Sequence, residues 1–366
     1  MKSHQPGGGA TQRDRFDFEM RAQRVVLGAG RVRDVPEELS SLGVGRAILI
    51  ASRSAKRAAD DLAGALGPVI VARIHEVVQH VPEREVATAL DLVATTSPEG
   101  LVTIGGGSAI GLGKAIAVEA GLPLLVVPTT YSGSEATSIY GITGEHKRTR
   151  RDPAALPRVV VYDPALTTSM PATVTATSGL NAVAHSVEAL YSPGANPLTD
   201  LFATESIRLL AGALPVAVTR PDDLSARVDA LQAAYLAGWS TATAGTALHH
   251  TLCHVIGGTH HLGHSELHAV LLPYVAGYNA PAAPEAMVTV AAALGTSDAP
   301  GGLRRLAERL EAPTALAALG LPHSALDDIV ARAITAVGER NPRAPDATSL
   351  RWMLEDAYAG RPPGHY

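Results

Sequence analysis

The stretch LVTIGGGSAIGLGKA, residues 101–115, decides the fold, because an apolar run leads directly into three glycines and then into a helix-forming segment. Glycine has no Cβ, so the backbone of such a turn can approach a pyrophosphate closely. The N–H groups at the start of the following helix carry a partial positive charge that favours anions. The stretch therefore predicts a strand, a phosphate-binding turn and a helix. Its predicted cofactor-binding residues are Gly105, Gly106, Gly107, Ser108 and Lys114.

Two other polar turns follow apolar runs, at residues 52–53 and 129–135. Parallel strands end at one edge of a sheet, where doubly wound folds bind dinucleotides. An acidic residue after an early strand would repel a 2′-phosphate, but this chain has Ser52 there, so NADH and NADPH are both predicted cofactors. A Walker loop is excluded, because Ser108 and Ala115 replace the glycine and the hydroxyl residue that it requires. The further cofactor-binding residues are Ser52, Thr129, Thr130 and Ser132.

Short β-branched runs alternate with Ala- and Leu-rich segments in the first half of the chain. This alternation is typical of βαβ units and of a mostly parallel sheet covered on both faces. Beyond residue 164 the β-branched runs end, and helical spacing dominates, with breaks expected at Pro215 and Pro273 among other prolines. The predicted strands lie at residues 25–27, 47–50, 69–71, 101–104, 124–127 and 159–161.

The predicted fold class is thus α/β followed by all-α. A flexible tail, residues 1–15, precedes a dinucleotide-binding domain, residues 16–164, which is built on a doubly wound, mostly parallel sheet. Residues 165–366 form an all-helical domain that is expected to bind substrate and carry the catalytic groups.

Charge and composition argue against several classes of protein. Thirty Lys and Arg against 35 Asp and Glu give a net charge of −5, and only 4% of residues are aromatic, so no nucleic-acid partner is expected. No run of about 18 uninterrupted apolar residues is present, so no membrane span is predicted. The single cysteine, Cys253, cannot form an intrachain disulfide, and the N-terminus shows no signal pattern, so a cytoplasmic location is expected.

Seven of the 14 histidines fall between residues 249 and 268. Two of them lie four residues apart, and the same spacing joins an asparagine and a histidine upstream. Residues four apart share one face of a helix, so two such helices can converge their polar side chains on one point. The clustering predicts a functional site. Its predicted catalytic residues are Asn181, His185, His250, His254 and His264.

Whether this cluster holds a metal depends on Asn181. Three imidazoles and a carboxylate would suit Zn²⁺ or Fe²⁺, but the chain has an amide where the carboxylate would complete that set. An amide oxygen is uncharged and a weaker ligand, so a dication would be held loosely. The same groups can instead form hydrogen bonds with a substrate carboxylate or a developing oxyanion. The residues permit a metal but do not require one.

Over about residues 16–363, these motifs together resemble the iron-containing alcohol dehydrogenase superfamily. The resemblance implies an N-terminal dinucleotide-binding domain and a C-terminal helical domain. The superfamily's metal ligands, an Asp and three His, correspond to Asn181, His185, His250 and His264. The histidine that the superfamily places near the nicotinamide corresponds to His254. Because the Asp is replaced, no metal is assigned.

Within the superfamily, the chain looks more similar to the maleylacetate reductase branch. Gly111, the short turn at residues 130–135 and the segment 179–182 separate it from the metal-dependent alcohol dehydrogenases. The segment 139–143 and the later residues 341–343 also resemble that branch, and Tyr140 is included in the catalytic site on this ground.

The resemblance implies reduction by NADH or NADPH of a carbon–carbon double bond conjugated to a ketone in a small dicarboxylate, such as maleylacetate to 3-oxoadipate. An alkoxide benefits from a Lewis-acid metal, whereas an enolate is a weaker base that imidazole hydrogen bonds can support. The alternatives are a metal-dependent alcohol or aldehyde oxidoreductase, a reductase of another enone or ketone in a specialised pathway, and a non-catalytic nucleotide-binding protein or a lyase.

The strand predicted at about residues 24–27 leads the sheet. Such a strand can pair with a second copy of itself across a two-fold axis, as the resemblance also suggests. A homodimer is therefore expected.

Overall fold

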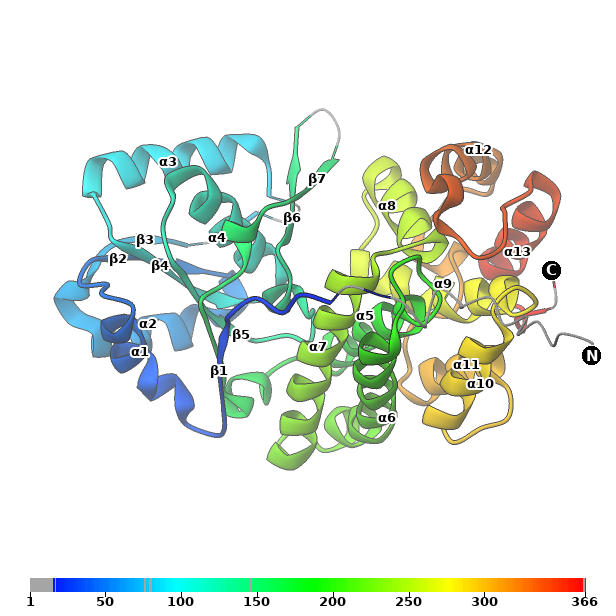
Figure 1. The fold of residues 1–366 in the computed structure, drawn as a ribbon, viewed down its shortest axis with the longest axis horizontal. Coiled ribbons are helices and arrows are strands. Elements are labelled where there is room, and N and C mark those ends of the chain that lie inside the picture. Colours follow the sequence, from blue (N-terminus) through cyan, green and yellow to red (C-terminus); the bar gives the residue numbers. More distant parts are fainter. Residues whose placement is uncertain (1–15, 17, 76, 79–80, 145–146, 365) are drawn as a thin grey trace, which may run out of the picture.

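The computed structural model describes residues 16, 18–75, 77–78, 81–144, 147–364 and 366, and the predicted tail at residues 1–15 lies outside the described residues. Two parts lie side by side along the long axis of the molecule (Figure 1). The first contains a parallel sheet with covering helices, and the second consists of helices. The predicted fold class is confirmed. The last strand of the sheet ends at Tyr162 and the first long helix of the second part begins at Ala172.

The main sheet has six strands in the order β1-β8-β5-β4-β2-β3, and every neighbouring pair is parallel. Each predicted apolar run forms one of these strands, although β3 extends beyond its predicted end. The strands are β1 (Arg24–Leu27), β2 (Ala47–Ala51), β3 (Ile70–Ile74), β4 (Gly100–Gly105), β5 (Leu124–Pro128) and β8 (Val159–Tyr162).

Both faces of the sheet are apolar. In β2, Ile48 and Ile50 belong to one core cluster and Leu49 to another, because successive side chains of a strand point to opposite faces. A strand buried on both faces reads as a continuous apolar run, which is how the sequence shows it. Helices α1 (Val35–Ser41) and α2 (Lys56–Leu66) cover the face of Leu49, and α3 (Glu83–Thr96) and α4 (Gly107–Ala120) cover the opposite face (Figure 1).

An antiparallel hairpin, β6 (Ile139–Thr143) and β7 (Lys147–Arg151), is inserted between β5 and β8. The sequence analysis did not predict it, because β7 reads KRTRR and has no apolar residue. Its ion pairs with α3 and α4 are Arg148–Glu83 at 3.4 Å and Arg150–Glu119 at 3.8 Å.

The second part is built from helices joined by turns. The sequence suggested that Pro215 and Pro273 end helices, but they lie inside α6 and α9, respectively. Both prolines are buried, so packing against neighbouring helices offsets the backbone hydrogen bond that each removes. The helices are α5 (Ala172–Ala189), α6 (Pro197–Thr219), α7 (Leu224–Ala244), α8 (Leu248–His260), α9 (His264–Asn279), α10 (Pro284–Ala293), α11 (Ala299–Arg309), α12 (Leu326–Val337) and α13 (Ala347–Ala359).

Within the part of the chain that the structure describes, α6 is the one helix long and apolar enough to cross a membrane by length and composition. It packs against α5, α7 and α10, and 44% of its most apolar window is buried in the protein. A separate core cluster lies among α8, α9, α12 and α13 and includes Cys253, which is completely buried.

Candidate active site

The predicted cofactor residues gather where the strand order reverses. The chain passes from β2 outward to β3, and then from β4 to β5 in the opposite direction, so the switch point lies between β2 and β4. Ser52 follows β2, and its backbone N–H donates to the Ile104 carbonyl at 3.1 Å. A Cβ added at Gly105 would lie only 2.6 Å from Ser52 Oγ, and φ at this glycine is +149°. Only glycine fits this close approach.

The glycine-rich turn also lies against the hydroxyl-rich turn that follows β5. The Thr129 N–H donates to the Gly105 carbonyl at 3.0 Å. A Cβ at Gly106 would lie 3.0 Å from Thr130 Cγ2, and one at Gly107 would lie 3.7 Å from Ser132 Cβ. Helix α4 begins at Gly107 with Ser108 in its first turn, and its unpaired N–H groups are suited to a phosphate.

The Lys114 ammonium lies behind this turn rather than in it. Nζ is buried and donates to the carbonyls of Ser134, Thr137 and Ile139 and to Thr137 Oγ1. Burial lowers the pKa of Lys114 to about 7, although the Glu135 carboxylate acts in the opposite direction. Because all of these neighbours are acceptors, the ammonium form fits the site. Lys114 therefore holds the backbone at residues 134–139 and does not form part of the predicted phosphate-binding turn.

Two contacts hold the hydroxyl-rich turn against the helical part. A Cβ at Gly238 in α7 would lie 2.1 Å from the Gly133 carbonyl oxygen, so the two backbones meet directly. The buried Arg227 of α7 donates to the Tyr131 hydroxyl at 2.8 Å. Neither contact was predicted from the sequence, since both join residues about a hundred positions apart. They hold the turn against α7, which in turn packs against α5, the helix that carries Asn181 and His185.

Replacing Gly106 with valine is expected to weaken NADH binding by at least about tenfold, or 1.4 kcal/mol. The added side chain would crowd Thr130 and the approach of the pyrophosphate. Fluorescence titration with NADH measures this effect. Gly64→Ala is the matched control, because Gly64 is an exposed position in α2 with open space around its Cβ. Equal affinity in both variants would contradict the site assignment.

The predicted catalytic side chains converge from three helices. Asn181 and His185 lie on α5, His250 and His254 on α8, and His264 on α9. The rings of His185 and His250 stack at 4.9 Å between centroids, and those of His254 and His264 stack at 5.7 Å. The structure therefore brings the four histidines into one region, and Asn181 lies one turn before His185 on the same face of α5.

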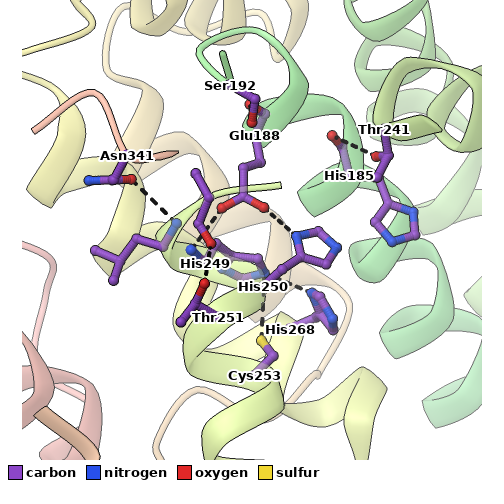
Figure 2. A network of polar contacts seen from close by, with 12 residues as sticks. His185, Glu188, Ser192, Thr241, His249, His250, Thr251, Cys253, His268 and Asn341 are labelled. Carbon is purple, nitrogen blue, oxygen red and sulfur yellow. Dashed lines mark hydrogen bonds and ion pairs between the residues drawn. The ribbon is translucent and has the colours of Figure 1, made fainter. Parts of the chain in front are cut away.

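Glu188, which the sequence analysis missed, organises this cluster from α5 (Figure 2). It accepts the His249 backbone N–H at 2.8 Å, which caps the start of α8, and its other oxygen is paired with His250 Nδ1. Burial acts to raise the pKa of Glu188, but His250, His249 and a backbone hydrogen bond together outweigh it, so the pKa lies below its usual value. A carboxylate only accepts, so Nδ1 is the donor and Nε2 of His250 remains for the site. A carboxylate one turn after His185 was the signal available in the sequence.

Two further histidines, His249 and His268, lie within the predicted window but were given no role. Both are fully buried. His249 Nε2 bonds His268 Nδ1 at 2.7 Å, and His268 Nε2 bonds His264 Nε2 at 3.1 Å. Burial lowers the pKa of His249 to about 3 and lowers the pKa values of His268 and His185 well below the usual range. These three rings are therefore neutral at pH 7.

Four buried polar atoms in the cluster have no hydrogen-bond partner among the described residues: Asn181 Oδ1, His185 Nδ1, His249 Nδ1 and His250 Nε2. Buried polar atoms are normally paired, so unpaired ones within one cluster indicate a place where a ligand binds. By contrast, Tyr140 lies in β6 within the hydrophobic core beside α4. Its inclusion in the catalytic site rests on the resemblance alone.

The buried neutral histidines predict a loss of stability in acid. Their folded pKa values lie below the unfolded value of 6.5, so the unfolded chain binds more protons between about pH 6.5 and 3. The free energy of unfolding should fall as pH is lowered through this window, by at most about 1.4 kcal/mol per pH unit for each histidine. Thermal unfolding between pH 7.5 and 5 tests this. His323→Ala removes an exposed histidine and is the comparison variant. A flat profile in the unaltered protein contradicts the prediction.

Comparison with known proteins shows which family this chain belongs to. The family model described as iron-containing alcohol dehydrogenase matches residues 22–164, and the one described as the C-terminal part of the Fe-containing alcohol dehydrogenase family matches residues 175–358. The chain belongs to the iron-containing alcohol dehydrogenase family. This membership confirms the resemblance inferred from the motifs and makes the protein an NAD(P)H-dependent oxidoreductase.

Individual members of the iron-containing alcohol dehydrogenase family match over nearly the whole chain. A maleylacetate reductase of Burkholderia cepacia is 43% identical over 346 residues, which span 94% of this chain and 98% of that protein. The crystal structure of a maleylacetate reductase from Agrobacterium tumefaciens has a TM-score of 0.91 at 40% identity and covers 95% of this chain and 99% of its own. A 1,3-propanediol oxidoreductase structure has a TM-score of 0.89 at 28% identity, with 94% of this chain and 100% of that chain covered.

The family's name implies an iron ion, but the donor set of this chain does not fit one well. Asn181 offers an uncharged amide, and His264 Nε2 is already bonded to His268. Among the described residues, the one group of three candidate donors whose atoms lie within 4.8 Å of one another is His249, Cys253 and His268, which is not the set that the family implies. These residues therefore give no support for a catalytic role of a metal.

Proposed function

We propose that this protein reduces maleylacetate, or a closely similar enone dicarboxylate, with NADH or NADPH and without a metal. Similarity to maleylacetate reductases over nearly the whole chain supports the substrate class. The observation that carries the metal-free mechanism is the donor set, in which Asn181 replaces the carboxylate and His264 Nε2 is engaged by His268.

The proposed reaction is a two-electron reduction of the double bond. The glycine-rich turn after β4 and Ser52 after β2 would hold NAD(P)H, which would supply the hydride. Addition of hydride to the alkene carbon farther from the ketone breaks the π bond and leaves the negative charge on the enolate oxygen. A proton then adds to the carbon next to the ketone, which restores the carbonyl group and completes the saturated product.

The side chains of the cluster divide this work between binding and proton transfer. The unpaired buried atoms of Asn181, His185 and His250 support a role in binding the enolate oxygen or a substrate carboxylate. Glu188 fixes the His250 ring and determines which of its nitrogens remains for the ligand. His254 is partly exposed and stacks on His264 at the edge of the cluster, so it is the group that we assign as proton donor.

A metal-dependent alcohol or aldehyde oxidoreductase is the second candidate, and one observation favours it. Histidines that bind metals commonly donate their other ring nitrogen to a carboxylate. The pair of His250 Nδ1 and Glu188 has this arrangement. The two candidates differ in metal dependence and in substrate, so one experiment can separate them.

That experiment follows NAD(P)H consumption with maleylacetate before and after treatment with a chelator. We expect the metal-free protein to keep its full rate, and we expect no rate increase when Zn²⁺ or Fe²⁺ is added. Simple alcohols and aldehydes serve as comparison substrates. If activity disappears on chelation and returns only with metal, the assignment moves to the metal-dependent candidate.

For the cofactor, we propose that NADH and NADPH both serve, within about tenfold of each other. Ser52 lies at the crevice where an acidic residue would repel the 2′-phosphate of NADPH. Steady-state rates with each dinucleotide test this selectivity.

We further propose that the protein forms a homodimer through β1. This strand is at the edge of the sheet, and Val25 in it is 39% exposed. An exposed edge can pair with its copy across a two-fold axis. Light scattering at micromolar concentration should give twice the chain mass of 37.8 kDa, and a monomer mass would remove the proposal.

A further inference from the structure

We propose that the imidazole of His268 occupies the centre of the histidine cluster in place of a metal ion and prevents His264 from binding one. The inference rests on the metal-free reductase proposed above, because it explains how this chain excludes the ion that its family name implies. His268 is a positioning residue in this view, since it acts through the rings around it.

The ring of His268 lies next to the rings of three other histidines of the cluster. It lies on α9, one turn after His264, and is fully buried. Its ring centroid is 4.5 Å from that of His264, 4.8 Å from that of His250 and 6.1 Å from that of His185. These three rings are the ones that the resemblance assigns as ligands, and His268 contacts all of them (Figure 2 shows His268 with His250 and His185).

The hydrogen bond between His268 and His264 occupies the His264 nitrogen that would otherwise be available to a metal. His264 Nε2 either donates a hydrogen bond to His268 Nε2 or accepts one from it, so in neither tautomer does it keep a lone pair for a metal. A metal lies about 2.0–2.1 Å from an imidazole nitrogen, which along the same line would leave only about 1 Å to His268 Nε2, given the 3.1 Å between the two nitrogens. The hydrogen bond and a metal on this atom therefore exclude each other.

The surroundings of His268 hold it in this position. Its Nδ1 bonds His249 Nε2 at 2.7 Å, and the His249 backbone N–H is in turn fixed by Glu188. Both ring nitrogens of His268 thus have partners, and rotation of the ring away from His264 would break both bonds. A buried ring with two fixed hydrogen bonds does not make room for an ion.

The experiment combines removal of His268 with restoration of a carboxylate at position 181. The variants are Asn181→Asp, His268→Ala and the double variant, and the probe is Co²⁺, whose binding is measured by calorimetry and by visible absorption. We expect the double variant to bind Co²⁺ at least about tenfold more tightly than either single variant. We also expect the double variant to give the absorption of a site with four or five ligands. Folding is checked by circular dichroism, and His268→Asn in the same background is the second opening variant.

The matched control is Asn181→Asp with Cys253→Ala. Cys253 is also buried in the network, and its Sγ lies 3.8 Å from His249 Nε2, but it is not one of the residues that the resemblance assigns as ligands. It should give no gain over Asn181→Asp alone. Equal gains in the two double variants, no gain from opening His268, or tight Co²⁺ binding by the unaltered protein would each overturn the inference. Loss of maleylacetate reduction on chelation would instead overturn the proposed function, so the two failures are distinguishable.

Discussion

Replacing His254 with alanine is expected to lower kcat for maleylacetate reduction by about 100-fold or more. The residue is partly exposed at the edge of the cluster, stacks on His264 and lies 6.2 Å from His250 between ring centroids. Its partial exposure lets it exchange protons with solvent, and we propose that it passes a proton to the bound substrate. Loss of a positioned proton donor slows the protonation of the enolate, whereas the binding of NADPH should change little.

Single-turnover and steady-state measurements separate these effects. The matched control is Thr259→Ala, because Thr259 is an exposed residue of the same helix whose hydroxyl bonds only to the helix backbone. A kcat within about threefold of the unaltered protein in His254→Ala, at every pH between 6 and 9, would assign proton donation to another group.

The second large effect is on stability, and it concerns Glu188. Its replacement with alanine should lower the free energy of unfolding by about 3–5 kcal/mol. The reason is that His250 Nδ1 and the His249 backbone N–H, both buried, would lose their acceptor. The start of α8 would also lose a negative charge that its helix dipole favours. Urea unfolding followed by circular dichroism measures the change.

The matched control is Glu355→Ala, which removes a partly exposed carboxylate that pairs with His323 and Arg351. Exposed ion pairs contribute about 0–1 kcal/mol, so this variant should unfold close to the unaltered protein. Glu188→Gln keeps one acceptor and should lie between the two alanine variants. Similar stabilities for Glu188→Ala and Glu355→Ala would show that Glu188 does not anchor α8.

Much of the sheet could be predicted because its information is local. Runs such as residues 47–50 and 124–127 are apolar throughout, and glycines stand where β4 ends. The hairpin at residues 139–151 was missed because its second strand is almost entirely basic. Pro273 was given too much weight, since tertiary packing tolerates it inside α9.

The helices that form the site could be predicted because histidines recur at a fixed spacing in the sequence. The pairing of individual side chains across helices could not be predicted. The histidine window and the four-residue spacings indicated which helices would converge. Glu188 was missed because a single acid in an Ala-rich segment reads as a surface residue, and only the structure shows that it faces His249 and His250. Lys114 was expected to bind the cofactor at the glycine-rich turn. Its position in the sequence does not reveal that its ammonium instead donates to the backbone carbonyls of Thr137 and Ile139.

Because Cys253 is completely buried, the reaction of its thiol with a reagent can report on motion of the protein. It is the only thiol of the sequence, and it lies in the core formed by α8, α9, α12 and α13. A thiol reagent can react with it only when this core opens, so the labelling rate at low reagent concentration measures the free energy of that opening. Comparing the rate with and without NADPH would report how strongly occupation of the crevice in one half of the molecule restrains the helices of the other.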